Sequence, residues 1–254
     1  MHLMTDSAGE LKVAMQQMLD GKIEGPALLR RLVSHNDWRI PIEIDGDGKR
    51  RPVFVKDTKD QRFQLLFTDE PSYQAGAKVI GPAIMGERYV EMKGVDLFAS
   101  LSDESDVAAV NWGAPPEIFF KQAQYASLRR WARAARVEQT LNSPTPDLKL
   151  LKHFDAYYIV LQKVEDGYAL TLAPDKHDRK IAAVFTAEDT LQAFLKDQRA
   201  GQIAFEPITR AIPGEHLFDD LKDLGLDGIA FNYSGPVPRR MFIASLASSV
   251  MAAE

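Results

Sequence analysis

Cysteine is absent from the sequence, which excludes disulfide bonds, thiolate metal sites and cysteine nucleophiles. Long apolar runs are absent too, and no window approaches the roughly 20 apolar residues that cross a bilayer. The first ten residues include Asp6 and Glu10 and lack an unbroken apolar core, so we expect no signal peptide. Together these absences predict a cytoplasmic protein that does not enter a membrane.

The familiar catalytic motifs are missing as well. The sequence has no Gly-x-Ser-x-Gly elbow, no phosphate-binding glycine loop and no His-Glu-x-x-His zinc motif. Histidines and aspartates form only local pairs, which supply too few ligands for a metal ion: His35/Asp37, His153/Asp155 and His177/Asp178. We therefore expect no enzyme activity, no metal and no cofactor. The net charge of −5 argues against a nucleic-acid partner.

Three short blocks recur in the same order further along the chain. At offsets of 118, 120 and 121 residues, the matched blocks are Leu65–Glu70 with Ala183–Glu188, Gly94–Phe98 with Gly214–Phe218, and Ala109–Gly113 with Ala230–Ser234. The common order and nearly constant spacing predict two diverged tandem copies of one module. The period is too long for a solenoid repeat and is typical of a duplicated domain.

Each copy is expected to contain three strands, a helix, a strand, a short helix and two strands. This β-β-β-α-β-α-β-β module predicts an α+β fold with a largely antiparallel sheet and helices packed on it. The first three strands are expected at 38–44, 52–56 and 63–67 in copy one, and at 157–162, 168–173 and 180–185 in copy two. Thr68 and Thr186 follow the third strands, where a hydroxyl can cap the next helix. Asp189 adds a capping-box-like spacing to Thr186.

The segments outside the repeated blocks set the predicted domain limits. Residues 1–36 form an N-terminal helical segment, and 37–141 form the first domain with a long C-terminal helix over 122–141. Residues 142–148 form a linker containing Pro144 and Pro146, which favour an extended path. Residues 149–254 form the second domain.

Four segments of copy one follow one another in the order of a known family: Trp38–Pro41, Leu66–Glu70, Glu91–Phe98 and Val110–Pro115. They resemble the SseB N-terminal-domain family, named after enhanced serine sensitivity in bacteria. Copy two, with Phe231–Pro236, resembles it with more departures. The resemblance implies cytoplasmic bacterial α/β domains, often repeated, without established catalytic residues. Some related sequences look like regulatory or immunity partners of other proteins.

The loops after the last repeated block are one candidate site. Asn111 and Asn232 each precede an aromatic residue, Trp112 or Tyr233, within a turn. An aromatic side chain on a rigid loop can anchor a protein partner. Alternatively, the asparagines hydrogen-bond to their own turns and the aromatic rings cover the sheet edge.

The helix over 122–141 carries a second candidate surface. Arg129, Arg133 and Arg136 follow an i, i+4, i+7 spacing and share one helical face. Guanidinium groups pair with carboxylates and phosphates, so this face can bind an anion or an acidic partner. The alternatives are a solvated helical face or a contact with the more acidic second half of the chain.

These patterns favour a non-catalytic protein that binds another protein in a regulatory, adaptor or immunity-like role. The alternative is an enzyme, or a protein that binds a small molecule or an anion, with its site in a cleft between the two domains. Arg129, Arg239 and Arg240 are the residues expected to serve an anionic ligand there.

Overall fold

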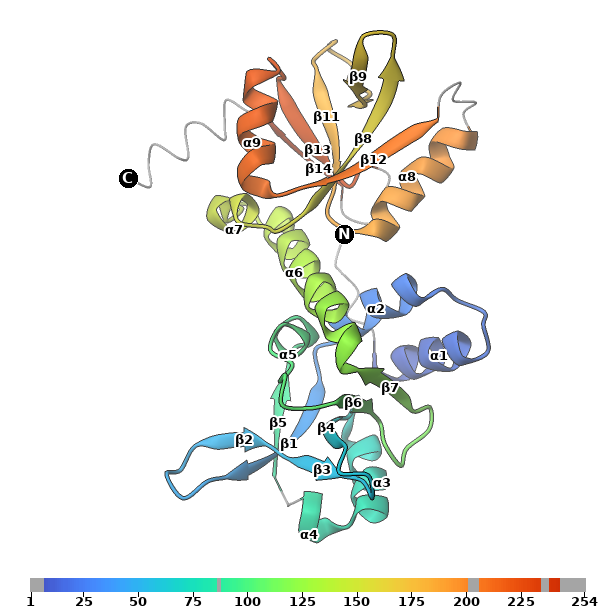
Figure 1. Cartoon of the computed structure of the whole chain (residues 1–254), viewed down its shortest axis with the longest axis vertical. Helices are drawn as coiled ribbons and strands as arrows, with labels where there is room; N and C mark the ends of the chain where they lie inside the picture. The colour runs from blue at the N-terminus through green and yellow to red at the C-terminus, as the bar shows by residue number, and fades with distance from the viewer. Residues whose placement is uncertain (1–6, 86–87, 201–205, 234–237, 243–254) are drawn as a thin grey trace. The chain divides into compact units, whose positions relative to one another are not determined.

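The computed structural model describes residues 7–85, 88–200, 206–233 and 238–242. The chain divides into two compact units, Met1–Ala135 (unit 1) and Arg136–Glu254 (unit 2). Helix α6 (Tyr125–Asn142) contributes residues to both (Figure 1). The division thus falls within α6, before the predicted linker at 142–148, and the predicted domain limits stay a prediction. Ser234–Pro236, which belong to the last repeated block and to the family resemblance, lie outside the described residues.

Unit 1 begins with two helices, followed by strands and shorter helices. In chain order its elements are α1 (Ala8–Leu19), α2 (Gly25–Ser34), β1 (Trp38–Ile44), β2 (Arg50–Pro52), β3 (Phe54–Lys56), β4 (Arg62–Leu66), α3 (Glu70–Ile80), α4 (Pro82–Met85), β5 (Tyr89–Met92), α5 (Gly94–Ala99), β6 (Val107–Val110), β7 (Ile118–Lys121) and η1 (Gln122–Gln124). The strands are ordered β2-β1-β5 and β3-β4-β6-β7. Two backbone hydrogen bonds between Arg39 and Phe67, of 2.8 and 2.9 Å, join these two sheets.

Unit 2 repeats this plan in one sheet. In chain order its elements after α6 are α7 (Leu148–Lys152), β8 (Tyr157–Val164), β9 (Gly167–Leu170), β10 (Leu172–Ala173), β11 (Ile181–Phe185), α8 (Glu188–Ala200), β12 (Pro207–Ile212), α9 (Gly214–Asp223), β13 (Gly228–Phe231) and β14 (Arg239–Phe242). The strand order is β12-β8-β11-β13-β14, with β9 on β8 and β10 on β11. In unit 1 the matching strands are β5, β1, β4, β6 and β7, with β2 on β1 and β3 on β4.

The α+β fold with a largely antiparallel sheet is confirmed, with one parallel pair in each unit. β4 and β6 are parallel, as are β11 and β13, because helices and a further strand separate them in the chain. The predicted second strand is divided into two short strands in each unit. The first of the two pairs with β1 or β8, and the second pairs with β4 or β11. At the junction between them Val53 N–H donates to Pro41 O and Thr171 N–H donates to Val160 O, both at 2.9 Å.

Helices cover both faces of each sheet. In unit 1, the buried side chains Leu65, Phe67 and Ala109 pack with Tyr73 of α3. The indole of Trp38 points to the other face, where it meets Phe98 of α5 edge to face at 5.3 Å. In unit 2, α8 packs on Phe185 and Ala230, and Tyr157 contacts Phe218 of α9 on the opposite face. Burial on both faces explains why these central strands are almost entirely apolar.

The helices that precede each first strand also correspond, which the sequence analysis did not find. Trp38 Nε1 donates to Leu32 O of α2 at 3.1 Å, and the Tyr157 hydroxyl donates to Leu151 O of α7 at 2.9 Å. Helices α1 and α2 of the predicted segment 1–36 are therefore packed into unit 1, and α7 takes the place of α2 in unit 2. These correspondences support the predicted duplication, which stays a prediction.

Each helix in the described parts of the chain is too short or too polar to cross a lipid bilayer.

Candidate protein-binding surface

The two parallel strands of unit 1 end side by side, and their ends are joined by Asn111. Its backbone N–H donates to Leu66 O at 2.8 Å. Its side-chain Oδ1 accepts from the Thr68 N–H at 2.9 Å and from the Thr68 hydroxyl at 3.2 Å. The side chains of Thr68 and Asn111 are fully buried. Asn111 has a φ of +57°, a left-handed conformation that asparagine tolerates. Asn111 therefore fixes the turn that leads into Trp112.

The same arrangement recurs in unit 2 with one additional group. Asn232 has a φ of +49° and its Oδ1 accepts from Thr186 N–H at 3.0 Å. The Asn232 Nδ2 donates to Glu138 Oε1 at 3.2 Å, and the Thr186 hydroxyl donates to the same oxygen at 2.6 Å. Glu138 is buried, so these two donors compensate part of the cost of removing its carboxyl group from water.

The helix cap predicted at Thr68 is wrong. Asp69 is the N-cap of α3, where its Oδ1 accepts from Ser72 N–H at 2.8 Å. The Thr68 and Thr186 hydroxyl groups instead form the hydrogen bonds to Asn111, Asn232 and Glu138. The local sequence is the same whether a threonine after a buried strand caps the next helix or bonds to a distant asparagine. The distant partner therefore decides between the two roles.

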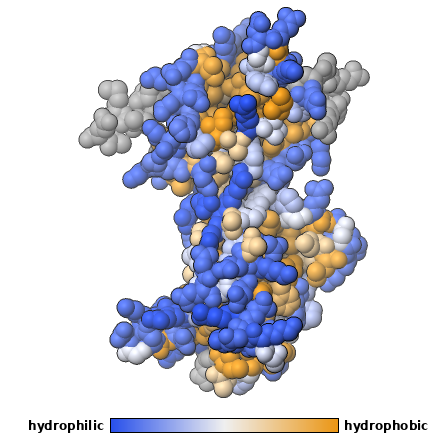
Figure 2. Space-filling model, viewed as in Figure 1, coloured by the Kyte–Doolittle hydropathy of each residue, from blue (hydrophilic) through white to orange (hydrophobic). Residues whose placement is uncertain are grey.

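Trp112 lies on the face of the sheet that α3 only partly covers. The small side chain of Ala109 leaves room for the indole, whose ring centre lies 4.8 Å from that of Phe63 and 6.3 Å from that of Phe119. Val79 of α3 borders the same loop. Phe119 is 45% exposed and Val79 is 63% exposed. We call Phe63, Val79, Trp112 and Phe119 the Trp112 patch; Figure 2 shows apolar residues gathered over the α3 end of this unit.

Two contacts hold the loop of the Trp112 patch in place. Gly113 N–H donates to Glu117 Oε1 at 3.0 Å. Gly113 has a φ of +83°, and a Cβ at this position would lie 2.9 Å from the Val79 side chain. The loop therefore requires glycine here, and it presents Trp112 in a defined position.

Unit 2 fills the corresponding position with an ion pair. Arg240 stands opposite Ala230 on β13, as Phe119 stands opposite Ala109 on β6. The Arg240 guanidinium lies 6.0 Å from the ring centre of Tyr233 and donates to Asp175 Oδ1 at 2.9 Å. Tyr233 is thus closed over by a paired arginine, whereas Trp112 is bordered by an exposed phenylalanine.

The carboxylate of Asp175 organises this part of unit 2. Its side chain is only 1% exposed, and Arg179 donates to both of its oxygens at 2.9 and 3.0 Å. The hydrogen bonds from Arg179 hold the pKa of Asp175 well below its usual range. Arg240 also donates to Pro174 O at 2.7 Å, so its charge is used within the unit.

Arg129 of α6 is held by groups outside the Trp112 patch. Arg129 donates to Leu101 O and to Asp103 Oδ1, each at 2.6 Å, and so ties α6 to the loop after α5. Arg133 and Arg136 are exposed, the first in unit 1 and the second in unit 2. Their predicted role in binding an anion or a partner stays a prediction.

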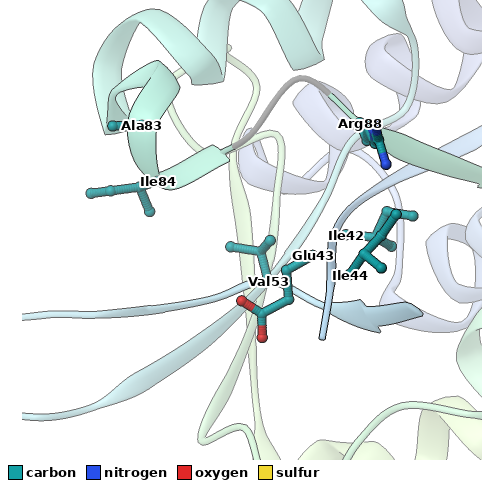
Figure 3. A pocket seen from close by; sticks show the side chains of 7 residues that line it. All are labelled: Ile42, Glu43, Ile44, Val53, Ala83, Ile84 and Arg88. Carbon is teal, nitrogen blue, oxygen red and sulfur yellow. The ribbon is translucent and has the colours of Figure 1, made fainter. Parts of the chain in front are cut away.

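A separate hollow of about 390 Å³ lies in unit 1 between β1, the β2–β3 junction and α4. Five of the seven residues that line it are apolar, and the charged ones are Glu43 and Arg88 (Figure 3). Figure 3 shows Glu43 beside Val53, with Ile84 of α4 facing them. A neighbouring hollow of about 440 Å³ shares Glu43, Val53 and Ile84. The lining is mixed polar and apolar, and its residues include no nucleophile paired with a base.

Within the part of the chain that the structure describes, no group of three or more histidines and carboxylates could hold a metal ion. Comparison of the whole chain with protein-family models, with curated proteins and with solved structures finds no match. The resemblance to the SseB N-terminal-domain family stays a prediction.

Sequence reasoning missed Phe119, Glu138 and Asp175. The signal for Phe119 was present: it lies ten residues after Ala109, as Arg240 lies ten residues after Ala230. Extending the third repeated block by six residues would have aligned Phe119 with Arg240. Asp175 has a local partner, Arg179, four residues further along, but its pairing with Arg240 and the bonds of Glu138 to Thr186 and Asn232 arise only through the fold.

Proposed function

We propose that this is a non-catalytic protein that binds another protein through the Trp112 patch, in a regulatory, adaptor or immunity-like role. One observation carries the proposal: unit 1 leaves Phe119 45% exposed beside Trp112, at a position that unit 2 fills with the paired Arg240. Exposed aromatic side chains on a rigid frame supply much of the binding energy of protein interfaces. The cytoplasmic location and the SseB-like, bacterial family are part of this proposal and rest on the sequence.

The buried polar residues beside the loops hold the loops in place. Thr68 and Asn111 are buried and bonded to each other, and their counterparts Thr186 and Asn232 are bonded to Glu138. Buried groups used in this way stabilise the loops but cannot reach a substrate. A partner that contacts this loop of unit 1 therefore meets the Trp112 patch rather than Thr68 or Asn111.

The proposal is tested by capturing partners from the native host with the full chain. We expect Trp112→Ala and Phe119→Ser to lose a protein that the wild type captures and that binds directly when purified. Tyr233→Ala should retain it, because Arg240 covers that ring. Tyr168→Ser, which removes a 55% exposed aromatic ring in unit 2, is the matched control. Unchanged capture by folded Trp112→Ala and Phe119→Ser would overturn the proposal.

Small-molecule binding is the second candidate, because the hollow in Figure 3 has the volume of a small ligand site. The predicted site between the two domains stays a prediction, and two of its arginines, Arg129 and Arg240, hold carboxylates of their own units. Thermal-shift screening with phosphates, nucleotides and amino acids tests this function, since a ligand of the native state raises Tm. A rise in Tm that Ile84→Glu removes would favour it.

A further inference from the structure

The outer edge of β7 exposes the backbone groups of one residue of the Trp112 patch. The N–H of Asn111 points toward β4. The backbone groups of successive residues in a strand point to opposite sides, so those of Ala108, three residues earlier, point toward β7. Ala108 stands opposite Phe120, which therefore carries the hydrogen bonds between β6 and β7. The N–H and C=O of Phe119 consequently point away from β6. β7 ends the strand order of its sheet, and no strand in the described ranges pairs with this edge.

The available edge is short. Lys121, two residues further along, also directs its N–H away from β6, but this group donates to Gln124 Oε1 at 2.9 Å. A partner strand can therefore form its principal pair of main-chain hydrogen bonds at Phe119. Side-chain contacts must supply the rest of the binding energy.

At Phe119 this edge lacks the charged side chain that would protect an edge strand, although Lys121 follows two residues further along. Charged residues usually occupy such positions and prevent pairing with another chain. β14 follows this rule, since Arg240 takes the position that Phe119 takes on β7. β7 instead places an aromatic ring beside Trp112, so its edge is suited to pair with a partner.

Basic side chains border the patch. Lys121 lies on the same face of β7 as Phe119, and Lys78 is adjacent to Val79 on α3; both lysines are exposed. The carboxyl group of Glu117 accepts from Gly113 N–H. The patch therefore favours a carboxylate of the partner beside Lys121.

We propose that the partner adds an extended segment to β7. This inference rests on the proposed function. The segment pairs with the N–H and C=O of Phe119, places an apolar side chain over Trp112 and Phe119, and places an acidic side chain beside Lys121. The apolar and the acidic residue are therefore two positions apart on one face of the segment, because successive side chains of a strand point to opposite faces.

The probe is a set of acetylated and amidated eight-residue peptides, read by fluorescence anisotropy against the full chain. In the first peptide, isoleucine and glutamate stand two residues apart on one face of the strand. The second peptide has lysine in place of glutamate. The third has the composition of the first in scrambled order. We expect the first peptide to bind at least about tenfold tighter than the others. N-methylation of its central isoleucine should cost a further tenfold, because it removes the main-chain donor without changing the side chain.

Variants of the chain complete the test. Phe119→Arg, which copies β14, should abolish binding, and Lys121→Glu should reverse the preference toward the lysine peptide. Tyr168→Ser should change neither. Hydrogen exchange should slow at the Phe119 amide on binding, whereas the Phe120 amide is already bonded within the sheet.

Failure of this inference is distinguishable from failure of the proposed function. Equal binding of the N-methylated and unmodified peptides, or no binding by any peptide, overturns strand pairing. Capture of a protein partner that still depends on Trp112 would then leave the proposed function standing. Capture that is independent of Trp112 and Phe119 overturns both.

Discussion

The side-chain nitrogen of Asn232 lies 3.2 Å from Oε1 of Glu138, whereas the matching nitrogen of Asn111 is buried without a hydrogen-bond partner among the residues described. The two asparagines otherwise have the same backbone conformation and the same threonine partner. Their difference makes the two units unequal at this point, because a carboxylate depends on the asparagine in unit 2 alone.

We expect Asn111→Ala to lower the free energy of unfolding by about 1–3 kcal/mol, because Thr68 N–H loses its buried acceptor. Asn232→Ala should lower it by more, since Glu138 then loses a donor as well. Urea unfolding of the full chain measures both. Asn111→Gly keeps the left-handed turn and removes only the side chain, so it should be less harmful than Asn111→Ala. Equal losses for the alanine variants at 111 and 232 would contradict this account.

The two glycines that open α5 and α9 should not tolerate a side chain. A Cβ on Gly94 would lie 2.5 Å from Leu32 O, and a Cβ on Gly214 would lie 2.5 Å from Leu151 O. Backbone atoms cannot move aside cheaply, so we expect Gly94→Ala and Gly214→Ala each to destabilise the protein by about 1–3 kcal/mol. Gly46→Ala is the control, because its Cβ would meet no atom within 4 Å. Chemical denaturation that shows no difference from this control would disprove the close packing.

Asp175 should make the stability of unit 2 depend on pH. Its pKa is lowered by the hydrogen bonds from Arg179, so the folded state binds fewer protons than the unfolded state in acid. Its contribution is present above the ordinary aspartate pKa, about 3.9, and is lost as the pH falls through the folded-state pKa. We expect Asp175→Asn to be less stable than wild type at pH 7 and to lose less stability on acidification. Thermal melts from pH 7 to pH 2, with the exposed Asp166→Asn as control, measure this.

Tyr157 should make the stability of unit 2 depend on pH in the alkaline range. Burial raises the pKa of its hydroxyl above the usual value, because the ionised form is disfavoured inside the protein. Its contribution is therefore complete below the unfolded-state pKa, about 10, and is lost as the pH rises above it. Tyr157→Phe removes the hydrogen bond to Leu151 O and should cost about 0.5–1.5 kcal/mol at pH 7. Above pH 10 the variant should lose stability less steeply than wild type in urea titrations.

Local patterns were sufficient for the strands and helices that form the core of each unit. The predicted strand at 38–44 matches β1 residue for residue, because apolar residues stand at every second position of this segment. The splitting of the next strand was not predictable, since it depends on Val53 bonding to one neighbouring strand while Phe54 begins the pairing with another. The helix cap failed for the same reason: Thr68 has a distant partner that outcompetes the local one.

The candidate site was only half accessible to sequence reasoning. Trp112 could be identified because an aromatic residue followed by glycine after a buried strand is conspicuous. Phe119 enters the proposed patch only through the register that places it opposite Ala109, and Tyr233 is left out of the patch because Arg240 lies over its ring. Exposure of a side chain depends on what the rest of the chain brings against it, and spacing along the sequence does not contain that information.

The continuity of α6 determines how the chain can be dissected. A protein cut at the proline-containing segment 142–148 would give a second fragment that lacks Val137, Glu138 and Leu141, all buried side chains assigned to unit 2. Asn232 and Thr186 would then lose the carboxylate that they share. Any fragment meant to preserve the second sheet intact has to begin upstream of Arg136, and so has to carry part of the helix that also serves the first.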